Sequence, residues 1–193
     1  MIYNMMGWGK GKTTSAIGIA ARALGNDEKI LFCQFLKNGN ESALNILSNH
    51  GENLNFLYLK QDTKGFELED CTDFWNACMA MINSENPSLV IFDELNVALD
   101  YKLFDYTSDE MIDWLKALAD DRDIYITGRI NTHILRHKMI EMADIATNCY
   151  CEAHSYNRHC KHCGMDFNPH YEYCPICGKK LQKSTKAKVG REC

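Results

Sequence analysis

Residues 7–14 read Gly-Trp-Gly-Lys-Gly-Lys-Thr-Thr, and they carry the most specific chemical signal in the chain. The run follows residues 2–5, an expected β-strand, and precedes apolar residues at helical spacing. Glycines let successive backbone N–H groups point at one anion, and the first turn of a helix adds positive potential. A plain glycine-rich turn is the alternative, but the order of strand, loop, Lys-Thr and helix predicts a phosphate-binding loop for ATP.

Two side chains of this loop have direct roles in such chemistry. The Lys12 ammonium is a mobile charge for phosphate oxygens, and the Thr13 hydroxyl is a ligand for Mg²⁺. The common motif, G-x-x-x-x-G-K-[ST], would place its first glycine where this chain has Met6, so the loop is a variant. The residues expected to contact the nucleotide are Gly7, Trp8, Gly9, Lys10, Gly11, Lys12, Thr13 and Thr14.

A pair of acids, Asp93 and Glu94, follows the apolar run 88–92, which predicts a buried strand. Parallel sheets bind ligands at the carboxyl ends of their strands. An enzyme with a phosphate loop needs an acid there to hold Mg²⁺, directly or through water. We therefore expect Thr13 and one of these acids to hold Mg²⁺ (or Mn²⁺). A helix cap at Asp93 is the alternative, and it leaves Glu94 free to bind the metal.

Four cysteines near the C-terminus form two CxxC pairs, each followed by glycine and separated by ten residues. This spacing predicts a closed, structural Zn²⁺ site with four thiolate ligands. An iron–sulfur cluster or a rubredoxin-like iron is the alternative for the same ligands. The four predicted ligands are Cys160, Cys163, Cys174 and Cys177.

Short β-prone runs alternate with amphipathic stretches, which predicts an α/β fold with a mostly parallel sheet flanked by helices. Residues 107–110, Thr-Ser-Asp-Glu, form an expected capping box. The expected strands span residues 2–5, 30–36, 54–59, 88–92, 123–127 and 145–150, and the expected helices span 13–24, 69–82, 107–119 and 132–142.

Composition divides the chain of 193 residues near residue 155, where the regular periodicity ends. We expect a phosphate-loop domain at 1–155, a zinc ribbon at 156–182 and a basic tail at 183–193. Residues 1–155 hold 13 basic and 23 acidic residues, for a net charge of −10, and residues 156–193 have a net charge of +5. Because the main body repels nucleic acid, a nucleic-acid partner is not expected.

The bulk composition, 46% hydrophobic and 24% charged, is typical of a soluble globular protein. No apolar run reaches the roughly 18 residues that span a bilayer, and the loop begins too early for a signal peptide. A cytoplasmic protein without membrane partners is therefore expected. Cys33, Cys71 and Cys78 lie in apolar segments, where we expect them to behave as small hydrophobic residues.

Ordered blocks over about residues 2–155 resemble the ATP:corrinoid adenosyltransferases of the cobalamin pathway. The resemblance implies a RecA-like α/β domain and a reaction in which a Co(I) corrinoid attacks C5′ of ATP and expels triphosphate. The substrates would be ATP and a reduced corrinoid, with an electron donor such as a flavodoxin, and a homodimer is plausible. The matched blocks are residues 7–14, 20–25, 34–37, 65–66, 77–80, 93–95, 127–129 and 143–144.

The same resemblance implies roles for individual residues. Catalysis would rest on Lys12, Thr13 and Glu94, with Mg²⁺ held by Thr13 and Glu94 and with Asp93 as the second candidate acid. The family places a Phe and a Trp, two residues apart, under the corrin. Here Phe66 matches the first position, while an aliphatic residue, Leu68, stands at the second.

Arg22 and Arg129 lie in matched blocks and are expected to contact ATP. Trp8 stands where the family commonly has a polar residue, so we expect its ring to pack against the nucleotide or the corrin. This chain also begins at its first expected strand, without the N-terminal helix that covers the corrin in some family members. One hypothesis is that the zinc ribbon supplies this cover.

Two other functions are compatible with some of these features. Zinc-bearing thymidine kinases also join a RecA-like domain to a four-ligand metal site, but they carry the common loop spacing that Met6 breaks. A nucleotide-switched binding protein that uses its ribbon on nucleic acid or protein is the second alternative. The acidic main body disfavours the nucleic-acid form.

Overall fold

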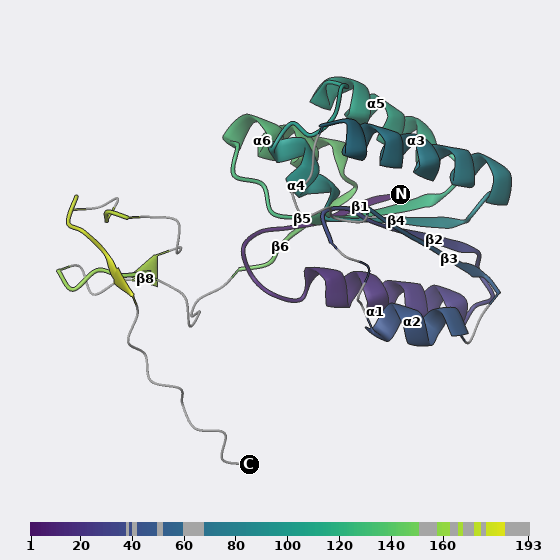
Figure 1. The fold of residues 1–193 in the computed structure, drawn as a ribbon, viewed down its shortest axis with the longest axis horizontal. Coiled ribbons are helices and arrows are strands. Elements are labelled where there is room, and N and C mark those ends of the chain that lie inside the picture. The colour runs from purple at the N-terminus through teal and green to yellow at the C-terminus, as the bar shows by residue number, and fades with distance from the viewer. Residues whose placement is uncertain are drawn as a thin grey trace, which may run out of the picture. The chain divides into compact units, whose positions relative to one another are not determined.

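The computed structural model divides the chain into two compact units, Met1–Tyr150 and Cys151–Cys193. Figure 1 shows the elements of both units. The structure describes residues 1–37, 39, 42–49, 52–59, 68–150, 158–162, 166–167, 172–174 and 177–183.

The first unit is built on a six-stranded sheet with the order β3-β2-β4-β5-β1-β6. Every neighbouring pair in this sheet is parallel. All the strands therefore end at the same edge, where loops can bring side chains together. The strands are β1 (Ile2–Met6), β2 (Ile30–Gln34), β3 (Leu54–Tyr58), β4 (Leu89–Asp93), β5 (Asp123–Gly128) and β6 (Ile145–Asn148).

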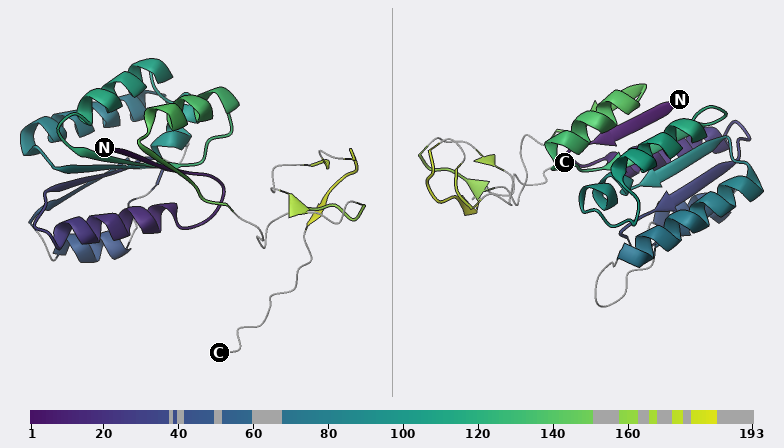
Figure 2. Two further views of the ribbon diagram at one scale, coloured as in Figure 1. Left: turned by 180° about the vertical axis from the view of Figure 1, so that it is seen from behind. Right: turned by 90° about the horizontal axis from the view of Figure 1, so that it is seen from above.

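Helices cover both faces of the sheet, as Figure 1 shows. Helices α1 (Lys12–Leu24) and α2 (Ser42–Asn49) lie on one face. The left view of Figure 2 shows the same separation of the two helical layers from behind. The other face carries α3 (Leu68–Glu85), α4 (Leu95–Asp100), α5 (Ser108–Leu118) and α6 (His133–Met142).

Alternation along the central strands creates two hydrophobic cores. In β2, Ile30 and Phe32 belong to the core under α1 and α2, while Leu31 and Cys33 belong to the larger core on the other face. All five residues of β2 are buried, as expected for a strand inside a parallel sheet that is covered on both faces. The sequence signal for such a strand is a continuous apolar run.

The three cysteines expected in the core, Cys33, Cys71 and Cys78, are fully buried, which confirms that prediction. Burial raises the pKa of the Cys33 thiol well above its usual value, and the neighbouring Cys78 adds to the shift. Burial likewise raises the pKa of Cys71 to about 12. The Cys33 and Cys71 thiols therefore stay protonated, and all three side chains act as packing groups.

The predicted strands and the four predicted helices are confirmed within a few residues at their ends. The capping box is also present, because Thr107 Oγ1 accepts a hydrogen bond from the Glu110 N–H and Glu110 accepts from the Thr107 N–H. Helices α2 and α4 were not predicted. Five of the six residues of α4 are buried, so this helix has no polar face to produce an amphipathic pattern.

The second unit contains a small antiparallel sheet with the order β8-β7-β9. A bridge between Tyr173 and Lys180 closes the turn that carries Cys174 and Cys177. Across the described parts of the chain, no helix has the length and apolar character needed to cross a membrane. The strands are β7 (Arg158–His159), β8 (Asp166–Phe167) and β9 (Gln182–Lys183).

Candidate nucleotide and metal sites

The glycine-rich loop joins the end of β1 to the start of α1. Gly7 and Gly11 have φ angles of 104° and 102°, in the left-handed region where other residues are strained. Lys12 and Thr13 are the first two residues of α1. The unpaired N–H groups of the first helical turn and the glycine backbone thus lie together, as an anion site requires.

The loop packs closely on the chain that follows β6. The Gly9 N–H donates to the Cys149 carbonyl at 2.8 Å, and a Cβ at Gly9 would lie 2.7 Å from the Tyr150 carbonyl oxygen. A Cβ at Gly7 would meet the Asn148 side chain at 2.4 Å. The glycines at these two positions are therefore needed for packing as well as for phosphate access.

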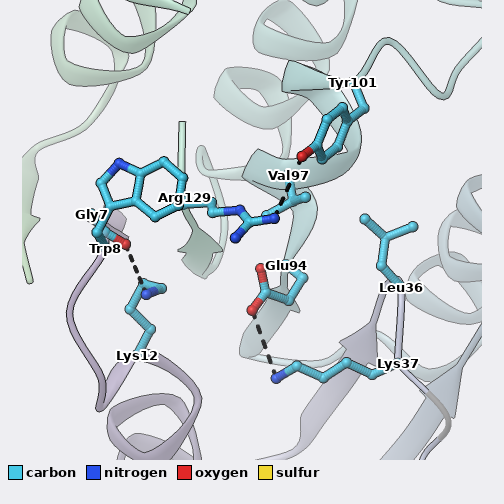
Figure 3. A pocket seen from close by; sticks show the side chains of 9 residues that line it. All are labelled: Gly7, Trp8, Lys12, Leu36, Lys37, Glu94, Val97, Tyr101 and Arg129. Carbon is cyan, nitrogen blue, oxygen red and sulfur yellow. Dashed lines mark hydrogen bonds and ion pairs between the residues drawn. The ribbon is translucent and has the colours of Figure 1, made fainter. Parts of the chain in front are cut away.

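The Lys12 ammonium reaches back across the loop. Its Nζ donates to the Gly7 carbonyl at 2.8 Å and to the Gly9 carbonyl at 2.7 Å. Figure 3 shows the Lys12 side chain beneath Gly7 at the wall of a cavity. This position holds the positive charge at the centre of the loop, where a phosphate group would bind.

Asp93, the last residue of β4, is fully buried and accepts hydrogen bonds from four side chains. Its Oδ1 accepts from Thr127 Oγ1 at 2.6 Å and from Thr13 Oγ1 at 3.0 Å. Its Oδ2 accepts from Gln34 Nε2 at 2.9 Å and from Lys37 Nζ at 2.8 Å. A carboxylate without solvent needs such partners, and here they tie β2, β4, β5 and α1 together.

Glu94 is placed differently, at the N-cap of α4 with a left-handed φ of 64°. The helix cap therefore falls at Glu94 rather than at Asp93, the position considered from sequence. Burial raises the pKa of Glu94, and the Asp93 carboxylate adds to the shift, while the charges of Lys37, Lys12 and Arg129 oppose it. The side chain stays 21% exposed and lines the cavity, so this carboxylate can meet a ligand.

A cavity of about 420 Å³ opens above the loop and the acid pair. Its walls come from the carboxyl ends of β1, β2, β4 and β5 and from α4, as the close view in Figure 3 shows. The volume is within the range usual for small-molecule sites. The lining residues are Gly7, Trp8, Lys12, Leu36, Lys37, Glu94, Val97, Tyr101 and Arg129.

Arg129 is held at this cavity by two aromatic residues. Its guanidinium carbon lies 5.0 Å from the centroid of the Trp8 ring, a cation–π contact, and its Nη2 donates to the Tyr101 hydroxyl at 3.4 Å. The preceding residue, Gly128, has a φ of 130°, and a Cβ there would lie 2.9 Å from Asn96 Cβ. Glycine thus lets β5 turn sharply beside α4 and present Arg129.

The structure brings most of the predicted nucleotide residues together but not Arg22. Arg22 lies in the last turn of α1, ten residues beyond Lys12, which corresponds to about 15 Å along a helix. It lines a different hollow with Tyr3 and Asp123, near the amino ends of β1 and β5. The expectation that Arg22 contacts ATP is therefore corrected, because a matched block does not show which end of a helix faces the ligand.

The corrin residues cannot be placed in the same way. Phe66 lies outside the described residues, as does the side chain of Leu68, the first residue of α3. Lys10, Gly11 and Thr14 lie in and just after the loop and are exposed. Their contacts with the nucleotide remain predictions.

Several residues of the site had no role assigned from sequence. Gln34, Lys37 and Thr127 lie at or just beyond the carboxyl ends of β2 and β5. The rule that selected the acid pair, polar residues at the ends of buried strands, would have selected these three as well. Tyr101 follows α4, a helix without a sequence pattern, so no comparable signal was available for it.

In the second unit, the sulfur atoms of Cys160, Cys174 and Cys177 all lie within 4.8 Å of one another. The Cys160 and Cys177 sulfurs are 3.6 Å apart, and Cys160 and Cys174 are buried. Tetrahedral zinc with Zn–S bonds of 2.3 Å places its sulfur ligands about 3.8 Å apart. The three described cysteines fit such a site, while Cys163 lies outside the described residues.

The fold and the first site together define an α/β protein of the RecA-like class with a phosphate-binding loop. The flagellar accessory protein FlaH from Methanocaldococcus jannaschii has a similar fold, with a TM-score of 0.59 at 14% identity, over 76% of this chain and 69% of that one. Residues 1–167 match the model of the ATP:corrinoid adenosyltransferase family BtuR/CobO/CobP. The chain belongs to this family.

Curated relatives agree with the family assignment. A corrinoid adenosyltransferase of Escherichia coli (strain K12) is 29% identical over 177 residues, covering 86% of this chain and 85% of the relative. Corrinoid adenosyltransferase CobA of Salmonella typhimurium is 32% identical over 138 residues, 67% of each chain. The resemblance and the fold class expected from the sequence are thereby confirmed, and the thymidine-kinase alternative loses its support.

Proposed function

We propose that this chain transfers the 5′-deoxyadenosyl group of ATP to the Co(I) centre of a corrinoid and releases triphosphate. The observation that most supports the proposal is the single cavity that combines the phosphate loop, Glu94 and Arg129. Family membership supports the class of acceptor. The natural acceptor is either complete cobalamin or one of its precursors.

The proposed reaction needs positioning and charge stabilisation rather than a base. The cobalt electron pair forms the bond to C5′ of ATP while the C5′–O bond breaks, and the bonding electrons leave with the triphosphate. No proton has to be removed from C5′, because the reduced corrinoid is itself the nucleophile. The protein has to align the two substrates and stabilise the charge that grows on the leaving oxygen.

Lys12 and Arg129 are proposed to bind the triphosphate together with the loop amides. The Lys12 ammonium already lies over the loop carbonyls and has to rotate only its flexible side chain to meet phosphate oxygens. Arg129 is fixed from both sides, by Trp8 and Tyr101, so little side-chain freedom is lost when it binds an anion. The remaining loop residues 7–14 are proposed to contribute backbone contacts.

Oxygen donors at the site fit Mg²⁺ or Mn²⁺. The Thr13 hydroxyl and the Glu94 carboxylate are hard ligands, and both lie near the loop. Because Asp93 already accepts four hydrogen bonds, we propose that it orients Thr13 and leaves direct binding to Glu94. When bound, the ion would supply positive charge that stabilises the departing triphosphate.

The corrin side of the reaction is proposed from the family pattern. Phe66 and Leu68 are proposed to lie under the corrin and to exclude the lower cobalt ligand. A low-potential electron donor, such as a flavodoxin, is proposed to bring cobalt to the Co(I) state. A homodimer and a cytoplasmic location stay predictions.

A second metal, Zn²⁺, is proposed for the cysteine cluster. Cys160, Cys174 and Cys177 would supply three thiolates and Cys163 the fourth. Four thiolates leave no open position on the ion, so the role would be to stabilise the fold of the second unit.

The test is anaerobic incubation of the purified protein with ATP, Mg²⁺ and chemically reduced cobalamin. We expect the absorption spectrum of an alkylcobalt product and one triphosphate released for each product formed. A Lys12→Met variant serves as the matched control and should lose most of the activity. Release of phosphate or diphosphate without a cobalt–carbon bond would overturn the proposal.

A further inference from the structure

The Lys37 ammonium lies among the oxygen atoms that the proposed function assigns to the divalent cation. Its Nζ donates to Thr13 Oγ1 at 2.6 Å and to Asp93 Oδ2 at 2.8 Å, and it lies 3.9 Å from Glu94 Oε1. Figure 3 shows the Lys37 side chain crossing the floor of the cavity toward Glu94. A lysine ammonium is a compact, strongly hydrated point charge, so it can satisfy the same oxygen atoms as a small cation.

Two positive charges cannot share this cluster of oxygens. The Thr13 hydroxyl accepts a short hydrogen bond from Lys37, which engages one of its two acceptor lone pairs. A divalent ion bound by Thr13 and Glu94 would also lie within a few ångströms of the ammonium, where like charges repel strongly in a partly buried site. Binding of the ion therefore requires Lys37 to leave its present partners.

The position of Lys37 in the chain allows its ammonium group to move from Asp93 into the cavity. It stands just beyond β2, after Leu36, whose φ of 51° turns the chain sharply at the rim of the cavity. The side chain is 27% exposed and lines the same cavity as Lys12 and Arg129. With four rotatable bonds, the ammonium can swing from Asp93 into the cavity, where the proposed triphosphate would supply replacement oxygens.

Asp93 can lose this partner without becoming an isolated buried charge. The Thr127 and Gln34 side chains would still donate to its two oxygens, at 2.6 Å and 2.9 Å. Departure of Lys37 would thus leave a satisfied carboxylate and an open Thr13 hydroxyl. The divalent ion would then replace the Lys37 ammonium as the positive charge near Thr13, Asp93 and Glu94.

We propose that Lys37 is a positioning residue that couples cation binding to ATP binding, an inference that rests on the proposed function. Without nucleotide, its ammonium occupies the cation position and lowers the affinity for a free divalent ion. With ATP, the ammonium moves to the triphosphate and opens the position, so that ion and nucleotide bind together. Linkage makes the coupling reciprocal, and either ligand raises the affinity for the other by the same factor.

The test uses Mn²⁺ as the probe, with free ion counted by electron paramagnetic resonance on the full-length chain. In Lys37→Met, we expect Mn²⁺ affinity without nucleotide to rise about tenfold and ATP affinity to fall about tenfold, within the usual range of coupling between sites. Lys37→Gln should behave like Lys37→Met, whereas Lys37→Arg should keep the low Mn²⁺ affinity. Lys116→Met removes a charge from the exposed face of α5 and should change neither affinity.

Thermal melting curves identify variants that fail to fold, and the Gln and Arg variants then carry the comparison. Unchanged Mn²⁺ affinity in folded Lys37→Met and Lys37→Gln would overturn the inference. These measurements need no corrinoid, so they separate this inference from the proposed reaction. If cobalt alkylation were absent while the Mn²⁺ results held, the proposed function would fail and the role of Lys37 would stand.

Discussion

Asp93 and Glu94 are adjacent in the chain, and the structure gives their carboxylates opposite surroundings. Asp93 points inward and accepts hydrogen bonds from four side chains, of which Lys37 carries a positive charge. Glu94 turns outward through a left-handed backbone, with its carboxylate partly desolvated beside Asp93. A non-glycine residue in this conformation is strained by roughly 1–2 kcal/mol, which the chain tolerates where function requires it.

Removing the charge of Glu94 should therefore stabilise the protein. Glu94→Gln is expected to raise the free energy of unfolding at pH 7 by roughly 0.5–2 kcal/mol, because the amide has no charge to desolvate and does not repel the Asp93 carboxylate. It should also weaken Mg²⁺-dependent adenosyl transfer. Urea unfolding followed by circular dichroism measures the first effect, and the cobalt spectrum measures the second.

The pH dependence of this gain has a definite sign. The folded-state pKa of Glu94 is raised, so the wild-type protein takes up a proton there more readily when folded and gains stability as the pH falls. The difference in the free energy of unfolding between Glu94→Gln and the wild-type protein should consequently shrink from pH 7 toward pH 5. Glu52→Gln makes the same substitution at an exposed position and is the control, measured over the same pH range. An advantage that grows on acidification would contradict this account.

At the scale of elements, the central strands β2 and β4 could be predicted because each is a short, mainly apolar run that is buried along its whole length. The phosphate loop could be predicted because its chemistry lies within eight consecutive residues. Helix α4 could not, since it is buried nearly all round and its sequence lacks helical alternation. The same gap hid Tyr101. The place of Lys37 just beyond a buried strand was a usable signal, but its partners lie 24 and 56 residues away in the chain and could not be predicted.

The end of β5 packs closely on α4 at Gly128, and this contact provides a test of how the two elements position Arg129. Gly128→Ala places a Cβ 2.9 Å from Asn96 Cβ at a φ of 130°, so we expect a loss of about 2–3 kcal/mol in the free energy of unfolding. ATP affinity should fall as well, because Arg129 is displaced. Chemical denaturation and nucleotide titration provide the two measurements.

A second glycine of the same unit makes a matched control. Gly18 lies inside α1, and a Cβ there would meet nothing within 4 Å beyond its chain neighbours and the helix's own backbone. Because alanine is the better helix former, Gly18→Ala should raise the free energy of unfolding by about 0.5–1 kcal/mol. Equal changes in the free energy of unfolding for Gly128→Ala and Gly18→Ala would show that the close contact between Gly128 and Asn96 does not limit which residue β5 can carry there.

The whole molecule is a phosphate-loop domain followed by a cysteine-rich unit, and their stabilities have different sources. The first unit has two hydrophobic cores of its own, one on each face of its sheet. Among the described residues of the second unit, the buried cluster consists of Cys160, Cys174 and Leu181, with Cys177 packed against it. A unit of about 40 residues rarely buries enough apolar surface to be stable by itself, and a bound metal commonly provides the missing stability.

Zinc should accordingly be needed for the second unit and not for the first. We expect about one Zn²⁺ per chain by elemental analysis, since four thiolates fill one tetrahedral site. Cys174→Ser/Cys177→Ser should lose the metal and keep wild-type ATP affinity, whereas Cys193→Ser, outside both CxxC pairs, should retain it. Loss of ATP binding in the double variant would show that the units do not fold independently. Weaker corrinoid binding with intact ATP binding would instead show that the ribbon contributes to the corrinoid site. In that case the metal would order ribbon residues that contact the corrinoid and are not needed for binding ATP.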